Sequence, residues 1–393
     1  MSKYSTMDEQ FIFRKQFRQV LAIVIVVGII GSLGAIFFSK PGSSRIWASI
    51  LLNNQFFLGI ALGSAFFLAV HRIAWSGWHT VLERIPESMT TFIPVAFLLM
   101  LLVYFGMDKI YHWSHSSGQD AILEGKKAWL NIPFFFLRLV LYFAGWIFLI
   151  RMMKKNSNLL MNSGDLKYHN RRKLYAGLFL VFYAVTVSAS SWDWIMSIDA
   201  HWYSTIFGWY VFIGMFVTSL AFIILLIWFL KRIGHLVYIR TDHVHDLSTL
   251  LFAFSIFWAY LWFSQYLLIW YSHIPEETTY FLQRKENFRI IFFVNLGLNF
   301  VVPFFGLIRL KSKRQLGVAA LVAAFVLIGH WIDYYQMIMP GAVGESARIG
   351  ILEICMTISY AGLFIYIIFN SLASRPLVNK NDPFLEESLN YES

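Results

Sequence analysis

The chain has 393 residues, of which 58% are hydrophobic and only 14% are charged, and its formal net charge is +10. A soluble domain is nearer half apolar and a quarter charged, so this composition excludes an ordinary soluble protein and indicates an integral membrane protein. The single cysteine, Cys355, excludes an internal disulfide, a cysteine-rich iron–sulfur site and a CxxCH haem attachment in this chain. The positive charge of a membrane protein usually reflects the positive-inside rule, so we expect no nucleic-acid partner.

Long apolar runs divide the chain into predicted transmembrane helices. A helix that crosses about 30 Å of hydrocarbon needs about 20 mainly apolar residues, and its backbone polar groups must be paired within it. Ten runs meet this requirement, which predicts an all-α integral membrane protein. They lie near residues 19–38, 51–71, 91–107, 132–151, 174–192, 206–230, 248–271, 288–309, 316–338 and 347–370.

The distribution of Lys and Arg predicts the orientation of these helices. The N-terminal segment, 1–18, has no small-residue cleavage pattern and is expected to remain as a cytoplasmic segment. This segment, the C-terminal tail 371–393 and the loops on their side carry most of the Lys and Arg residues, which marks that side as cytoplasmic. An even number of spans places both termini there. The polar tail is expected either to lie along a partner or to be disordered.

One outward-facing stretch, Ser190–Gly208, holds two acidic residues among aromatic ones. Its sequence, SSWDWIMSIDAHWYSTIFG, contains Asp193 and Asp199, several Trp and Tyr residues and no Lys or Arg. Trp and Tyr favour the membrane–water interface because their rings are apolar at one end and polar at the other. From residue chemistry alone, the stretch predicts an interfacial loop with an aromatic belt.

Ionisable residues inside the predicted spans are candidate functional groups, because a charge in hydrocarbon is costly. At about 1.5 Å of rise per residue, Arg138 and Glu353 lie roughly 9 Å below the outer surface, and His330 lies about 21 Å along an outward-running helix. Asp333 follows His330 by one turn on the same face. The residues that converge on the outer half, and predict a polar chamber open to the outer side, are Asp193, Asp199, His330, Asp333, Glu353, Arg138 and Gln265, with Asn295 at a similar depth.

Each of these groups also has a structural interpretation. Arg138 can extend its guanidinium to the outer interface, and Asp333 can be a rim residue in water. His330 and Asp333 can form a hydrogen bond between turns, or the pair can pass protons near neutral pH. The ionisable residues of the inner half are expected to stay near the rim, and they are His71, Glu83, Arg84, His245 and Asp246.

Three motifs, in order along the chain, resemble a known family. They are SWDWIMSIDAHWYSTIFGWYVF, which begins at Ser191, FWAYLWFSQYLLIWYSHIPEETTYFLQR (Phe257–Arg284) and GHWIDYYQMIMPG (Gly329–Gly341). Each is similar to the paired large membrane subunits of bacterial alternative complex III. These complexes are quinol:electron-acceptor oxidoreductases of the polysulfide-reductase (NrfD-like) superfamily. The similarity covers most of the chain.

The resemblance implies two four-helix bundles, at 51–192 and 206–338, within a single membrane domain, 1–393. Flanking helices would include the last span, 347–370. It implies that this chain binds no metal or redox cofactor directly, and that partner subunits carry c-type haems and iron–sulfur clusters. Menaquinol or ubiquinol would be the substrate of the complex. The implied partners are a paralogous quinol-binding membrane subunit, periplasmic multihaem cytochrome c and iron–sulfur subunits, and lipids of the bacterial inner membrane.

The sequence departs from the family pattern in the second span. The quinol-contacting paralogue is expected to carry a His there in a GxGHAG-like context, whereas this chain has GIALGS at Gly59–Ser64. The following WSGWHTVLERIPESM (Trp75–Met89) resembles the shorter paralogue, to which proton conduction or scaffolding is usually assigned. The spacing of Gly59 and Gly63 also predicts close packing of this span against another helix.

These observations support three hypotheses. In the first, the chain is an energy-conserving subunit beside the site of quinol oxidation, and protons leave through the outer polar chamber. In the second, it is a secondary transporter, which would have broken helices at corresponding places in its two halves. Pro303 is the only proline well within a predicted span, and no matching break is found. In the third, it is an assembly scaffold whose polar groups tie helices together.

Overall fold

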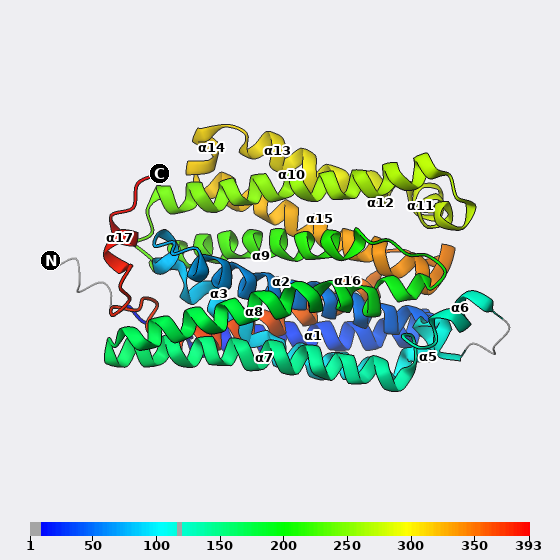
Figure 1. Ribbon diagram of the computed structural model, residues 1–393, viewed down its shortest axis with the longest axis horizontal. Helices are drawn as coiled ribbons and strands as arrows, with labels where there is room; N and C mark the ends of the chain where they lie inside the picture. The colour runs from blue at the N-terminus through cyan, green and yellow to red at the C-terminus, as the bar shows by residue number, and fades with distance from the viewer. Residues whose placement is uncertain (1–8, 116–119) are drawn as a thin grey trace.

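A computed structural model describes residues 9–115 and 120–393, and its elements are helices throughout the described residues. Within these residues, ten helical segments are long and apolar enough to cross a membrane. The long helices run roughly side by side along the longest axis of the molecule (Figure 1). The prediction of an all-α integral membrane protein with ten spans is confirmed.

Eight of the ten spans are continuous helices, and two are interrupted. The continuous ones are α1 (Lys15–Ser39), α2 (Ser43–Ile73), α7 (Ile132–Ser163), α8 (Leu166–Trp194), α9 (Phe207–Arg232), α10 (Thr241–Ser272), α15 (Leu316–Val343) and α16 (Ile351–Leu372). The third span consists of α3 (Arg84–Met89), α4 (Ile93–Leu101) and α5 (Met107–Ile110), joined by 3-10 turns. The eighth consists of α12 (Arg289–Leu296) and α13 (Val302–Leu307), separated by a π-helical turn.

Short helices cap the spans at both ends. They are η1 (Trp78–Leu82), η4 (His112–His115), α6 (Ala121–Lys126), η5 (Met196–Asp199), α11 (Pro275–Asn287), α14 (Leu310–Arg314), η7 (Gly344–Ser346) and α17 (Leu385–Leu389). Several spans also extend beyond the apolar runs that predicted them. α2 begins at Ser43 rather than near residue 51, and the 32-residue α7 continues to Ser163. A helix of that length is about 48 Å long, so its polar last turns extend beyond roughly 30 Å of hydrocarbon.

The spans pack in two groups of four helices. In the first group, α7 packs along α8, α8 contacts α2, and α4 contacts both α7 and α2. In the second group, α9 packs against α10 and α15, and the interrupted span α12–α13 packs against α10 and α15. α1 and α16 pack against each other, and α16 also contacts α2. This grouping agrees with the two bundles and two flanking helices expected from the resemblance. The groups share one continuous hydrophobic core, because α2 and α9 also pack closely.

Glycine permits the close approach of α2 to α9. A Cβ atom at Gly63 would lie 2.4 Å from the carbonyl oxygen of Met215 and 2.8 Å from Cβ of Ser219. Beside this contact the hydroxyls of Ser64 and Ser219 are 2.8 Å apart. The close packing predicted from Gly59 and Gly63 is confirmed, and a side chain at Gly63 would force the two groups of helices apart.

Both ends of the described chain lie at the same end of the helices, which we call the terminal end (Figure 1). There the backbone N–H of Leu377 donates a hydrogen bond to the carbonyl oxygen of Glu9 at 3.0 Å. Residues 1–8 of the predicted segment 1–18 lie outside the described residues. We call the opposite end of the helices the distal end, and the charge pattern predicts that it faces outward.

The C-terminal tail packs across the terminal end of its own chain, which corrects the expectation of a disordered segment; contact with a partner stays a prediction. Its apolar residues Leu377, Val378 and Leu385 are buried. Arg375 pairs with Glu87 at 2.7 Å, and the other polar contacts of the tail reach several different helices. The sequence did not reveal this packing because the apolar residues of the tail are few and irregularly spaced.

Candidate functional site

Asp333 lies at the centre of a buried polar cluster in the distal half of the second helix group. Its carboxylate accepts hydrogen bonds from the Tyr210 hydroxyl, from Nδ2 of Asn295 at 2.8 Å and from Nε1 of Trp258 at 3.3 Å. Asp333 belongs to α15, and its three donors belong to α9, α12 and α10. Each of the other helices in the group thus contributes one donor, and none of these donors is a cation. The suggestion of a rim residue in water is wrong, since Asp333 is buried.

Among the described residues, Asp333 is the one buried acidic side chain without an Arg or Lys partner. The other buried acids pair with arginine, as Glu83 with Arg72 and Arg172, Glu87 with Arg84 and Arg375, Asp193 with Arg138, Asp242 with Arg314, Glu353 with Arg45, and Asp382 with Arg172. Holding a buried charge without a counter-charge costs free energy. This carboxyl group is therefore the strongest candidate in the described chain for a site of proton exchange.

His330 lies one turn before Asp333 on α15, as predicted. Its Nδ1 is 3.9 Å from Oδ2 of Asp333, which is too far for a hydrogen bond, so the predicted bond between turns is not formed. Both ring nitrogens are buried and have no hydrogen-bond partner among the described residues. A buried imidazole with free nitrogens beside a carboxyl group that lacks a cation is suited to proton transfer.

A small cavity of about 20 Å³ lies beside Asp333. This volume is about that needed for one water molecule. Gln265 and Gln336 line the cavity, and the Nε2 atom of each has no hydrogen-bond partner among the described residues. Gln265 therefore lines the same cavity as Asp333.

Arg284 and Asp199 connect this cavity to the distal surface. Arg284 lines the cavity and its Nη2 pairs with Oδ2 of Asp199 at 2.9 Å, while its Nε donates to the carbonyl oxygen of Gln336. The Asp199 side chain is 24% exposed. The guanidinium lies 3.4 Å above the ring of Tyr280, and burial raises the pKa of that phenol to about 12. The sequence had not singled out Arg284, although it is the last residue of the second motif.

Arg138 and Asp193 form a separate cluster in the first helix group. Nε and Nη2 of Arg138 each donate to a carboxylate oxygen of Asp193 at 2.8 Å. Nε1 of Trp129 at 2.8 Å and the Tyr142 hydroxyl at 3.1 Å complete the set of donors. Asp193 was expected in an interfacial loop, but α8 continues to Trp194 and buries Asp193 in its last turn. The alternative in which Arg138 extends to the outer interface is also corrected, because Arg138 binds this carboxylate.

Glu353 belongs to a third cluster, which ties α16 to α2. Nε and Nη2 of Arg45 donate to its carboxylate at 2.7 and 2.8 Å, and the backbone N–H of Gly350 donates at 2.9 Å. Because α16 begins at Ile351 rather than near residue 347, Glu353 lies in its first turn and not deep within the span. Its contacts are those of a helix-capping residue in an ion pair.

The seven predicted residues thus separate into three groups instead of lining one chamber. The depth estimated from the rise per residue placed all seven residues in the distal half. The depth of a residue does not determine toward which neighbouring helix its side chain points. The second-group cluster holds Asp199, Gln265, His330 and Asp333, whereas Arg138 with Asp193 and Glu353 with Arg45 form pairs elsewhere. Their roles in proton movement stay a prediction.

A further ionic cluster lies at the terminal end, where only rim residues were expected. Arg72 and Arg172 both donate to Glu83, and Arg172 also pairs with Asp382 of the tail at 2.5 Å. Burial alone would raise the pKa of Glu83, but the charges of Arg72 and Arg172 hold that pKa well below its usual range. All four side chains are buried, so this cluster fastens α2, α8 and the tail together.

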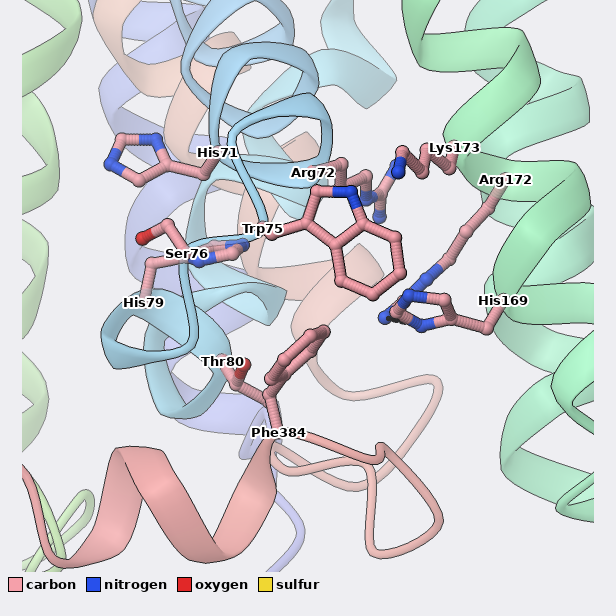
Figure 2. Close-up of a pocket in the computed structure, with 10 residues that line it drawn as sticks. All are labelled: His71, Arg72, Trp75, Ser76, His79, Thr80, His169, Arg172, Lys173 and Phe384. Atoms are coloured by element: carbon pink, nitrogen blue, oxygen red, sulfur yellow. Dashed lines mark hydrogen bonds between the residues drawn. The ribbon is translucent and has the colours of Figure 1, made fainter.

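A cavity of about 10 Å³ adjoins this ionic cluster, and Figure 2 shows its lining residues. The rings of Trp75, His169 and Phe384 lie close to one another in its wall (Figure 2). Burial, with a smaller contribution from His71, lowers the pKa of His79 well below its ordinary value, so this imidazole is neutral at physiological pH. Within residues 9–115 and 120–393, no group of three or more His, Cys, Asp or Glu side chains is placed to hold a metal ion.

Comparison with known proteins finds no family model that matches the chain and no matching curated protein. The class of the protein therefore rests on its own structure, which is that of an all-helical, multi-pass membrane protein with ten spans in the described residues. Within this class, the feature that stands out chemically is the buried carboxyl group of Asp333 with its neutral donors.

Proposed function

We propose that the chain is a membrane subunit of a bacterial respiratory quinol:electron-acceptor oxidoreductase and that it carries protons between Asp333 and the distal surface. Oxidation of a quinol releases protons together with electrons. A subunit beside the site of oxidation therefore needs a group that exchanges protons and a polar route to the exit side. The observation that carries the proposal is the burial of Asp333 among neutral donors, without a cation.

The position of the three motifs supports this proposal. Each motif contributes to the Asp333 cluster, the first through Asp199 and Tyr210, the second through Trp258 and Arg284, and the third through Asp333 itself. Motifs that are far apart in the sequence thus meet around one carboxyl group. This convergence is what a shared functional site requires, whereas residues that only favour a membrane interface would have no need to meet.

The proposed route runs from His330 and Asp333 through the small cavity to Arg284 and Asp199. Asp333 would hold the proton, and His330 would exchange it on the side away from the surface. Gln265 lines the cavity beside it. Asp199 pairs with Arg284 and is partly exposed, so its carboxylate provides an acceptor at the exit. Each step uses a group of this chain, and no cofactor bound directly to it is involved.

The resemblance supplies the remainder of the proposal. The complex would lie in the bacterial inner membrane, with the distal end of this chain toward the periplasm. Its substrate would be menaquinol or ubiquinol. A paralogous membrane subunit would bind the quinol, and periplasmic subunits with c-type haems and iron–sulfur clusters would take the electrons.

The test is quinol-to-acceptor turnover of the purified complex with Asp333→Asn, normalised to intact complex on a native gel. Asparagine keeps the size and the polar character of the side chain but cannot carry the proton. Loss of a positioned proton-transfer group typically lowers a rate by about 10²–10⁴-fold, so we expect at least a tenfold loss. Glu345→Gln, which removes an exposed carboxylate, is the matched control. Full turnover of assembled Asp333→Asn complex would contradict the proposal.

A scaffold function is the second candidate, because the Arg138–Asp193 and Arg45–Glu353 pairs do tie helices together. It predicts that Asp333→Asn changes assembly without changing the turnover of assembled complex. A secondary transporter gains no support. The π-helical turn near Pro303 interrupts the third helix of the second group, but in the first group the interrupted span is the second helix, so the breaks do not correspond.

A further inference from the structure

A long apolar groove opens between α15 and α16, and its lining residues differ from those of the cavity beside Asp333. Both helices pack against α2, and the space between them has a volume of about 380 Å³. Phe56 of α2 and Phe222 of α9 line it on the inside. Ile328 and Ile354, at its edges, are about half exposed, so the groove is open to the surrounding membrane.

The wall of this groove offers hydrocarbon and no free hydrogen-bonding group. The two polar side chains that line it are Thr357 and Trp331. Thr357 donates its hydroxyl proton to Oδ1 of Asn53 at 2.8 Å, and Nε1 of Trp331 points to the same oxygen at 3.3 Å. Asn53 is itself buried. A quinone ring or another polar ligand would find no donor here, whereas a hydrocarbon chain would be well accommodated.

The length of the groove matches one leaflet of a bilayer. It runs along α16 as far as Ala361 and includes Ile349 just before the helix begins at Ile351. The stretch from Ile351 to Ala361 corresponds to about 15 Å of helix, which is half of the roughly 30 Å of hydrocarbon in a membrane. The groove therefore extends from the distal interface to the middle of the membrane.

The residue next to Ile349, at the distal end of the groove, is a cation. Arg348 directly precedes Ile349, is exposed and makes no ion pair within the described residues. Its backbone carbonyl accepts a hydrogen bond from Arg45 at 2.9 Å, which fixes this part of the chain, and the charge of Arg45 is already matched by Glu353. A free guanidinium at the level of the headgroups is a favourable partner for a phosphate, because its fork of N–H donors can bind two phosphate oxygens.

We infer that this groove binds one phospholipid of the distal leaflet, with an acyl chain between α15 and α16 and its phosphate at Arg348. The inference rests on the groove and its charged mouth and does not depend on the proposed respiratory function. An isoprenoid quinone shares the hydrocarbon chain but lacks the phosphate, so the two occupants are distinguished by mass and by the effect of removing the Arg348 charge.

The experiment is native mass spectrometry of the purified full-length protein, first as isolated and then after delipidation and titration with dioleoyl phosphatidylglycerol. Ala361→Phe fills the deep end of the groove, and Arg348→Gln removes the charge at its mouth without touching the core. Val181→Phe is the matched control, because Val181 is 73% exposed on the membrane face of α8, away from the groove.

We expect wild type and Val181→Phe to retain one more phospholipid than Ala361→Phe. We also expect the phosphatidylglycerol affinity of Arg348→Gln to fall several-fold relative to wild type. Equal phospholipid retention in wild type and Ala361→Phe would overturn the inference, as would a quinone that is lost from Ala361→Phe in place of a phospholipid. Unchanged phosphatidylglycerol affinity in Arg348→Gln would overturn the assignment of the phosphate to Arg348. Because this variant alters only an exposed side chain, we expect it to fold like the wild type.

Discussion

The two helix groups hold buried aspartates in corresponding helices but give them different partners. Asp193 lies on α8 and Asp333 on α15, the last helix of each group. The third helix of each group supplies a donor at the same depth, since Arg138 is six residues beyond Ile132 and Asn295 is six residues beyond Arg289, where these spans begin. A Tyr and a Trp complete both sets of donors.

Under the proposed function, the difference between Arg138 and Asn295 distinguishes a structural site from a site of proton exchange. In the first group, Asp193 accepts two charge-assisted hydrogen bonds from the guanidinium of Arg138. In the second group an amide takes the place of the guanidinium, so the carboxyl group of Asp333 keeps the same kind of position without a counter-charge. The cluster around Asp193 therefore serves as the structural reference for the proposed proton-exchange site at Asp333.

The largest expected effect is on stability, in the first group. Arg138→Gln leaves the buried carboxylate of Asp193 without its cation, which typically costs about 3–5 kcal/mol. We expect a marked fall in the thermal unfolding temperature of the purified protein and less assembled complex. The double variant Arg138→Gln/Asp193→Asn removes the stranded charge and should recover part of the loss. A fully stable Arg138→Gln protein would show that the ion pair is not what holds this cluster.

The terminal end extends the comparison, because Glu83 is a second acid held by arginines. Glu83→Gln should destabilise the protein at pH 7 by about 3 kcal/mol, since Arg72 then loses its buried partner. The pKa of Glu83 is held below the ordinary 4.5, so its stabilising effect is present above that pH and is lost as the pH falls through the lower folded-state value. The difference in unfolding temperature between Glu83→Gln and wild type should therefore narrow below about pH 4.5. A constant difference across this range would argue against the ion pair.

Asn295→Arg tests the comparison most specifically, because it places in the second helix group an arginine equivalent to Arg138 of the first group. An arginine here should hold Asp333 as an ion and lower quinol turnover of assembled complex at least tenfold, which corresponds to about 1.4 kcal/mol. Asn295→Met, which is also larger than Asn but carries no charge, controls for size. If the two variants assemble and turn over equally, charge at this position does not control proton exchange.

The smallest effect is expected at Glu353. Glu353→Gln weakens the pairing with Arg45 and the contact with the N–H of Gly350 at the start of α16. The loss of a helix-capping contact is typically about 1 kcal/mol, so the unfolding temperature should fall by a few degrees. Turnover per assembled complex should stay at the wild-type level. A large loss of turnover in stable, assembled complex would return Glu353 to the proton route.

The sequence was sufficient for the helices and for placing the polar residues in the distal half, although Glu353 lies nearer the start of its helix than predicted. The length of the apolar runs predicted ten spans, and the Gly59–Gly63 spacing predicted the close contact between α2 and α9. Helix ends were less accurate wherever polar turns extend a helix into water, as in α7. An apolar run reports hydrocarbon thickness and does not report where the hydrogen-bonded helix stops.

The pairing of the polar residues could not be obtained from the sequence. Arg138 and Asp193 lie on different helices, and only the packing of α7 on α8 brings them together. Arg72 and Arg172 were overlooked because each lies in the polar end of a helix, where an exposed position is the ordinary expectation. The partner of Arg172 lies in the tail, at Asp382, and no local pattern connects the two.

The central claim is that Asp333 gains and loses a proton during turnover, and infrared difference spectroscopy of the complex tests it directly. Spectra recorded between the oxidised and quinol-reduced states report carboxyl groups that change protonation. We predict a C=O stretching signal of a protonated carboxyl group that is present in wild type and in Glu345→Gln and is lost in Asp333→Asn. An unchanged signal in Asp333→Asn would contradict the account and would leave Asp333 as a structural residue, like Asp193.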